Sequence, residues 1–291
     1  MRNEIFAEMI LKAQQAEITE HHIYKRLAEM SGDEHNSEIL RNIAADEKSH
    51  YEFWADHTGK TIKPNRFKIF LYTLLARLMG FTFAIRLMER GEDLAQENYH
   101  VLAEEISAVR DIEEDENAHE EALIDMLEEE KLQYASSIVL GLNDALVELT
   151  GAIAGLTFAL QNPQLVAVAA LVTGISASLS MGGSEYLSTK TDDSAVKDPL
   201  RASVYTGVAY IFAVAILVLP FFVAGNSIYL ALAWTLLNAV LIILGFTYYI
   251  SVARNENFPR RFLEMVSISM GVALVSFGIG LLVRQVLGID V

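Results

Sequence analysis

The chain has 291 residues, a formal net charge of −16 and a hydrophobic content of 52%, and one globular core seldom combines so much charge with so much apolarity. An acidic surface repels phosphate backbones, which argues against nucleic-acid binding and favours cations as partners. Because the chain has no cysteine, it has no disulfide, no thiolate metal site and no cysteine nucleophile.

The charge is unevenly distributed along the chain. Residues 1–133 contain 15 Lys and Arg, 29 Asp and Glu and all seven His, whereas residues 134–291 contain 7 Lys and Arg, 9 Asp and Glu and no His. We therefore expect two domains, residues 1–133 and residues 134–291. The N-terminus lacks the apolar run of a signal peptide, so the first domain is expected not to be exported.

The first domain has helical periodicity over residues 2–30, 33–58 and about 83–133, without strand signals, and is expected to form four helices. It contains Glu-x-x-His twice, as Glu47 with His50 and as Glu116 with His119, each preceded by Asp. In each copy the Glu and the His lie one turn apart on the same helix face. This spacing predicts two carboxylate and imidazole pairs directed into one bundle.

The other two helices of this domain also repeat, at an offset of 75 residues that aligns Glu17 with Glu92 and Tyr24 with Tyr99. A turn at Gly32–Asp33 would bring Glu17 level with the first Glu-x-x-His pair, and a second turn is expected near residues 104–108. The two tyrosines either hydrogen-bond a ligand or pack in the core.

One Glu from each of two helices and a Glu-x-x-His from each of the other two form the ligand set of a di-iron or di-manganese carboxylate bundle. We therefore expect two divalent metal ions in this domain, and both iron and manganese accept the set. The expected ligands are Glu17, Glu47, His50, Glu92, Glu116 and His119.

Residues 66–88 are apolar enough to suggest a membrane span, but Lys68, Arg77 and Arg86 interrupt them. A crossing here would also place Glu17 and Glu92 on opposite sides of the membrane. We expect no span, and the segment is either a basic amphipathic helix at the membrane interface or a crossover within the bundle.

The second domain contains five apolar stretches of the length that crosses a bilayer, near residues 138–160, 164–187, 202–224, 228–252 and 264–287. Two of the connections carry Lys and Arg, and by the positive-inside rule these are cytoplasmic. Five spans then place the first domain in the cytoplasm and the C-terminus outside.

Charged residues within the spans point to a transport pathway. Asp144 and Glu148 lie four residues apart in the first span, where a carboxylate is costly and by default functional. In the second span, Met181 and Glu185 have the same spacing. Carboxylate oxygens with a thioether suit a divalent transition metal, although Met181 alone is more often a packing residue.

At these residues the chain resembles two known families. The first domain resembles the erythrin domain, which is rubrerythrin-type and ferritin-like. The second resembles the vacuolar iron transporter family through the segments Leu142 to Glu148 and Ser180 to Tyr186. The resemblance to a fusion of the two, of the membrane-bound ferritin type, extends over essentially the full chain.

The resemblance implies an all-α protein, with a cytoplasmic ferritin-like bundle followed by a five-helix transmembrane domain. It also implies a homodimer in the cytoplasmic (inner) membrane that exports Fe²⁺ or Mn²⁺, with proton antiport, through Asp144, Glu148, Met181 and Glu185. Two features depart from these families: there is no rubredoxin-like Cys₄ centre, and the loop Thr189–Leu200 is too short for the helical metal-binding insert of plant-type transporters.

Three readings of the bundle remain open, because it could capture, oxidise or sense the metal. The alternative to a transporter is a membrane-tethered ferroxidase or peroxidase whose spans only anchor it. Apart from the metal ligands, the sequence indicates no catalytic residue, and enzymatic activity is left undecided.

Overall fold

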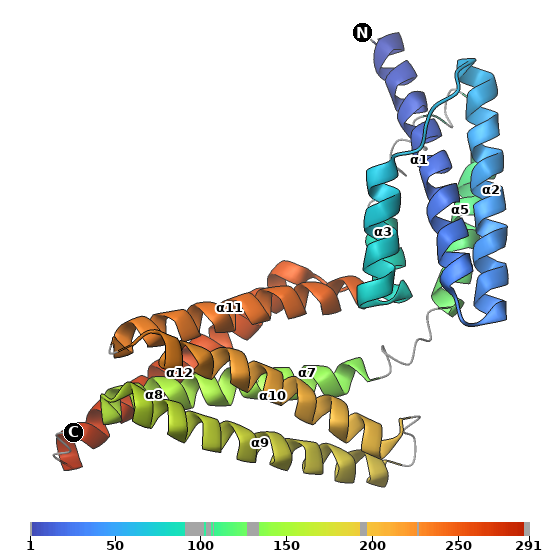
Figure 1. The fold of residues 1–291 in the computed structure, drawn as a ribbon. Helices are drawn as coiled ribbons and strands as arrows, with labels where there is room; N and C mark the ends of the chain where they lie inside the picture. Colours follow the sequence, from blue (N-terminus) through green and yellow to red (C-terminus); the bar gives the residue numbers. More distant parts are fainter. Residues whose placement is uncertain are drawn as a thin grey trace. The chain divides into compact units, whose positions relative to one another are not determined.

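The structure is a computed structural model that describes residues 2–90, 102, 106, 108–126, 134–192, 197–225 and 227–287. Every regular element in these residues is a helix, which confirms the predicted all-α class. The chain divides into two compact units, Met1–Glu129 and Glu130–Val291, which are described separately (Figure 1).

The first unit is built around a helical hairpin. Helices α1 (Arg2–Met30) and α2 (Glu34–Thr58) pack side by side, as Figure 1 shows. The turn lies at the predicted position, where the Asp33 carboxylate accepts hydrogen bonds from the backbone N–H groups of His35 and Asn36 and so caps α2. The hairpin therefore begins and ends close to the limits expected from periodicity.

Further helices complete the described part of this unit. Helix α5 (Val109–Met126) packs on α2 and carries the second Glu-x-x-His. Just before it, the backbone N–H of Ile106 bonds to the carbonyl of Leu102, and that of Val109 bonds to Ile106. Of the described residues here, Leu102 is helical and Ile106 is not, and α5 begins at Val109, close to the expected second turn.

Helix α3 (Arg66–Met79) lies in the apolar segment 66–88, for which we expect no membrane span, and it packs against α1. Its 14 residues span about 21 Å, short of the roughly 30 Å of hydrocarbon in a bilayer. It ends at Gly80, whose φ of 101° is strained for other residues, and helix resumes over residues 81–90.

Within its described residues, the second unit contains five helices long and apolar enough to cross a membrane, as predicted. The first runs from Ala135 to Leu160 as α7 (Ala135–Asp144), a π-helical turn η1 (Ala145–Leu149) and α8 (Thr150–Leu160). The others are α9 (Pro163–Thr191), α10 (Pro199–Val223), α11 (Ile228–Ala253) and α12 (Phe258–Leu287).

Close helix contacts and satisfied carbonyls hold this unit together. A side chain at Gly141 would collide with the backbone carbonyl of Thr206, so α7 and α10 touch at this point. Pro220 has no N–H for the carbonyl of Ile216, and the amide of Asn238 donates to that carbonyl instead, at 3.1 Å. This replacement hydrogen bond is needed in an apolar environment, where an unpaired carbonyl is costly.

Candidate functional site

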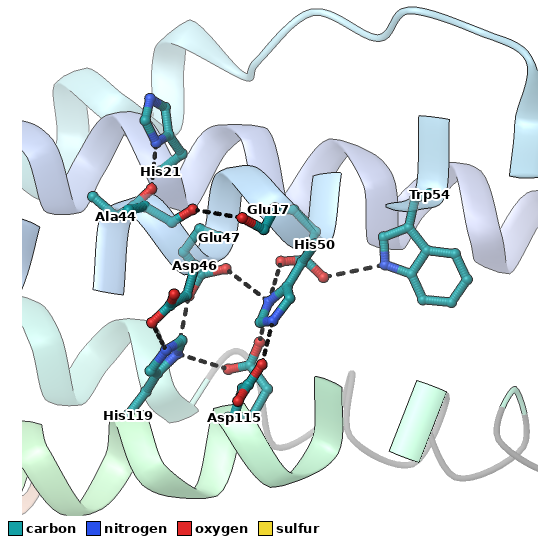
Figure 2. A network of polar contacts seen from close by, with 12 residues as sticks. Glu17, His21, Ala44, Asp46, Glu47, His50, Trp54, Asp115 and His119 are labelled. Atoms are coloured by element: carbon teal, nitrogen blue, oxygen red, sulfur yellow. Dashed lines mark hydrogen bonds and ion pairs between the residues drawn. The ribbon is translucent and has the colours of Figure 1, made fainter. Parts of the chain in front are cut away.

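Three helices of the first unit direct their predicted ligands to one place, shown in Figure 2. Glu17 comes from α1, Glu47 and His50 from α2, and Glu116 from α5, and one ligand atom of each lies within 4.8 Å of the others. Glu17 and Glu47 are almost fully buried, at 0% and 2% exposed. The predicted ligand Glu92 and the predicted neighbour Tyr99 lie outside the described residues.

Two of these carboxylates face both imidazoles. The Nδ1 atom of His50 lies 3.9 Å from Oε2 of Glu47 and 3.6 Å from Oε1 of Glu116. The Nδ1 atom of His119 lies 3.5 Å from Oε1 of Glu47 and 3.9 Å from Oε2 of Glu116. Each of the two carboxylates therefore presents one oxygen to each imidazole, whereas Glu17 faces His50 alone in these contacts, with Oε2 at 3.5 Å from Nδ1.

The aspartates that precede the two Glu-x-x-His segments hold the imidazoles from across the bundle. His50 Nε2 lies 3.2 Å from Oδ2 of Asp115, and His119 Nε2 lies 3.2 Å from Oδ2 of Asp46 (Figure 2). Because an ionised carboxylate only accepts, each Nε2 donates, and when the ring is neutral Nδ1 is the atom whose lone pair is directed toward the glutamates. This is the tautomer that a metal-binding histidine needs, with the outer carboxylate fixing the ring.

Trp54, on α2, contacts the carboxylate of Glu17 on α1. Its indole N–H donates to Oε1 of Glu17 at 3.3 Å, and its side chain is fully buried. Because Oε1 is held by Trp54, Glu17 directs Oε2 toward His50. Tyr24 lies in the apolar core of the unit, and the half-buried His21 bonds to the carbonyl of Ala44.

Crowding of carboxylates shifts the acidity of the cluster. Burial raises the pKa of Glu47 well above its usual value, and the charges of Glu116 and Glu17 add to this. Burial and the charge of Glu17 raise the pKa of Glu116 to about 8. Burial lowers the pKa of His50, but its contacts with Glu17 and Asp115 outweigh this and raise it to about 9. Burial lowers the pKa of His119.

The donor atoms fit a divalent metal. The Nδ1 atoms of His50 and His119 are buried and have no hydrogen-bond partner within the described part of the chain, and such orphaned atoms call for an explanation. Carboxylate oxygens and imidazole nitrogens are the donor set of iron and manganese carboxylate sites. The residues that would hold the metal are Glu17, Glu47, His50, Glu116 and His119.

The second candidate site lies in the spans. Asp144 and Met181, from α7 and α9, line one pocket of about 410 Å³ together with Ser136 and Asn143. Three apolar side chains complete the wall: Val139, Leu140 and Val147. Two of the four predicted pathway residues therefore line one open pocket.

The other two predicted pathway residues each bond to a hydroxyl group. Glu148 is exposed, and its Oε2 accepts a hydrogen bond from the hydroxyl of the buried Tyr210 at 3.2 Å. Glu185 accepts through Oε1 from the hydroxyl of Ser137 at 2.6 Å. Neither carboxylate lines the pocket that contains Asp144.

The helix changes its winding between Asp144 and Glu148. Residues Ala145–Leu149 form a π-helical turn, so the four-residue spacing assumed for an α-helix does not measure one α-turn here. The hydroxyl of Ser269, on α12, donates to the carbonyl of Leu146 at 2.6 Å. Ser269 therefore supports the turn that contains Glu148 and directly follows Asp144.

Sequence reasoning missed several of these residues. The sequence does mark Asp46 and Asp115, because each directly precedes a Glu-x-x-His segment. It does not indicate that each aspartate contacts the histidine of the other segment. Glu20, one turn after Glu17, also went unnoticed, and burial with the charge of Glu17 raises its pKa to about 8. Trp54, Tyr210 and Ser269 carried no recognisable motif.

Comparison with known proteins bears on the second unit. The model of the VIT family matches residues 135–198, which include the first two spans and both acids of the first span. The match and the five apolar helices fit a membrane domain of this kind and indicate an integral membrane protein. The chain has no match among curated proteins and none among solved structures.

Proposed function

We propose that the protein is a divalent iron or manganese exporter of the cytoplasmic membrane, with proton antiport, and that its first unit is a ferritin-like di-metal domain. The observation that carries the transport assignment is the shared pocket of Asp144 and Met181, inside the segment that the VIT family model matches. A carboxylate and a thioether together favour a transition metal ion over Na⁺.

Proton coupling would follow from the chemistry of the pathway acids. A carboxylate binds a cation when it is ionised, so a metal ion and a proton compete for Asp144 and for Glu148. Release of the metal on the outer side would leave these acids free to take up protons there. By the positive-inside rule, export then moves metal from the side of the first unit to the side of the C-terminus.

For the first unit, we propose two divalent ions held by the cluster of Figure 2. Support comes from Glu47 and Glu116, which each offer one oxygen toward His50 and the other toward His119. Glu17 would complete the His50 side, and Glu92 remains the sixth ligand expected from the repeat. The bound metal would supply redox or Lewis-acid chemistry, while the protein's residues fix and desolvate the ligand atoms.

The test is metal flux into or out of proteoliposomes under an imposed pH gradient, with Fe²⁺ and with Mn²⁺. Asp144→Asn removes the charge from the pocket with little change in size, and flux should fall by at least about 10- to 100-fold, the loss typical of changing even a residue that supports a metal ligand. The matched control is Glu264→Gln, which removes an exposed acid of α12 that does not line the pocket. Undiminished flux in Asp144→Asn would contradict the assignment.

A second candidate function is a membrane-tethered ferroxidase or peroxidase. It is favoured by one observation: the described ligands of the metal cluster all come from the first unit. Oxygen or peroxide consumption with Fe²⁺ that persists in Asp144→Asn, disappears in Glu47→Gln and is accompanied by no flux would establish the enzyme in place of the transporter.

The bundle could also regulate the spans. If it senses metal, Glu116→Ala should change the metal concentration at which flux is half-maximal without abolishing flux. If it only captures the ion, saturating metal should restore the normal rate. We further propose a homodimer in lipid as the working form, which cross-linking in proteoliposomes would test.

A further inference from the structure

Helix α3 presents a stripe of large apolar side chains to solvent. Among the described residues of the first unit, all four exposed large hydrophobic side chains belong to α3: Phe67, Phe70, Leu74 and Leu78. Phe67 and Leu78 are each 69% exposed. The spacing of these residues places them on one side of an α-helix.

The opposite side of α3 is firmly attached to the unit. Ile69 and Ala76 are buried, at 5% and 3% exposed, and belong to the apolar core beneath the helix, which runs along α1 (Figure 1). The start of α3 is also fixed, because the backbone N–H of Asn65 donates to the hydroxyl of Thr19 on α1 at 2.9 Å. These contacts fix the orientation of α3 on the unit, so the same face of the helix is always the exposed one.

Basic residues flank this stripe in an acidic unit. From Gly59 to Met88 the chain has six Lys and Arg and no Asp or Glu, although residues 1–133 as a whole carry 29 acids against 15 basic residues. Arg66 and Arg77 lie along one edge of the stripe and Lys68 along the other, and all three are exposed. Neither Arg66 nor Arg77 forms an ion pair with a described residue. An apolar stripe with basic edges is the pattern of a helix that lies in the interface of an anionic membrane.

We infer that the exposed face of α3 rests in the headgroup region of the membrane that the spans of the same chain cross. Only eight peptide units join Met126, the last residue of α5, to Tyr134 before the first span, so a short connection links the unit that carries α3 to the spans. Pairing of two copies through this face would oppose basic edges, whereas anionic lipid complements them. The inference does not depend on the proposed transport function.

The absence of cysteine allows a direct test with the full chain in nanodiscs. Leu78→Cys, and Phe70→Cys as a second site should the first disturb folding, receive an environment-sensitive fluorophore, and quenching by lipids with doxyl groups is measured. The matched control is Glu38→Cys, at an exposed position of α2. In discs that contain phosphatidylglycerol, quenching at the α3 labels should be at least about threefold stronger than at the control, as expected for a helix at acyl-chain depth.

Charge dependence completes the test. Each basic residue near an anionic surface strengthens association about fivefold, so the quenching should weaken in discs of phosphatidylcholine alone and in an R66E/R77E variant. Equal quenching at the α3 and control positions would overturn the inference. So would labels that are shielded from water but not quenched by lipid, together with Leu78→Cys cross-links between two copies, because these would assign the face to a second copy.

Discussion

The metal cluster of the first unit and the pocket of the spans use similar donor atoms in different surroundings. In the bundle, Glu17 is fully buried and held by an indole N–H, and both imidazoles are fixed by carboxylates from another helix. In the spans, Asp144 lines a pocket, and Glu148 is exposed and accepts a hydrogen bond from the hydroxyl of Tyr210. We infer that the first arrangement suits a resident metal and the second an ion that must leave.

The largest expected effect concerns the shared carboxylate of the bundle. Glu47→Gln removes the negative charge that faces both His50 and His119 and replaces one of its two oxygens by an NH₂ group, so both ions should be lost, whereas Glu17→Gln should affect the ion on the His50 side. Metal content of the purified protein measures the difference. The exposed Glu38→Gln is the control, and equal losses in the Glu17 and Glu47 variants would contradict the sharing.

The crowded acids of the bundle should also make the stability of the first unit depend on pH. The pKa values of Glu20 and Glu116 rise to about 8 and that of His50 to about 9, so the metal-free folded unit holds more protons than the unfolded chain between roughly pH 4.5 and 9. Its stability should therefore fall as pH rises through this window, by about 1.4 kcal/mol per pH unit for each excess proton. Burial lowers the pKa of His119, so at pH values below its usual pKa this residue binds fewer protons in the folded unit than in the unfolded chain and partly offsets the fall in stability.

The chain offers a reporter for that measurement. Trp54 lies in the bundle and Trp234 in α11, so in Trp234→Phe the remaining indole reports unfolding of the first unit. Added Mn²⁺ should restore stability at high pH because it replaces the protons. A metal-free bundle that gains stability steadily from pH 5 to pH 9 would contradict the proposed crowding of acids.

A smaller effect is expected from the carboxylate behind an imidazole. Asp46→Asn weakens the hold on His119 Nε2, and metal affinity should fall by about 10- to 100-fold without loss of the fold. Titration with Mn²⁺ measures it against Asp56→Asn, an exposed aspartate of the same helix. Identical affinities in the two variants would show that the cross-bundle contact does not support the site.

The smallest effect belongs to the π-helical turn. Ser269→Ala removes one hydrogen bond to the carbonyl of Leu146, at a cost of about 1 kcal/mol. Flux should fall several-fold through displacement of Asp144 and Glu148, while Ser267→Ala, at an exposed position of α12, should leave flux unchanged. Unaltered flux in Ser269→Ala would show that the turn does not depend on this bond.

Much of the fold could be predicted because it depends on local patterns. The helices of the first hairpin and the five spans follow from periodicity and apolar length, and Glu47, His50, Glu116 and His119 follow from spacing. The contacts of Trp54 with Glu17 and of Ser269 with Leu146 join residues 37 and 123 positions apart. They depend on how helices pack, which no spacing within a single helix encodes.

The same reason explains the winding of the first span. Nothing in Ala145–Leu149 distinguishes a π-turn from ordinary helix, and its carbonyl at Leu146 is supported from α12. The break at Gly80 was equally hidden, because one glycine in an apolar run is compatible with a continuous helix.

If the spans move the metal and the bundle keeps its own, the two functions should separate in one crossed experiment, in which flux and bound metal are measured on the same preparations of Asp144→Asn and Glu47→Gln. We expect Asp144→Asn to lose flux and retain the metal of the bundle, and Glu47→Gln to lose that metal and still transport at saturating concentration. Flux that persists in Asp144→Asn and disappears together with the bundle metal in Glu47→Gln would contradict this separation.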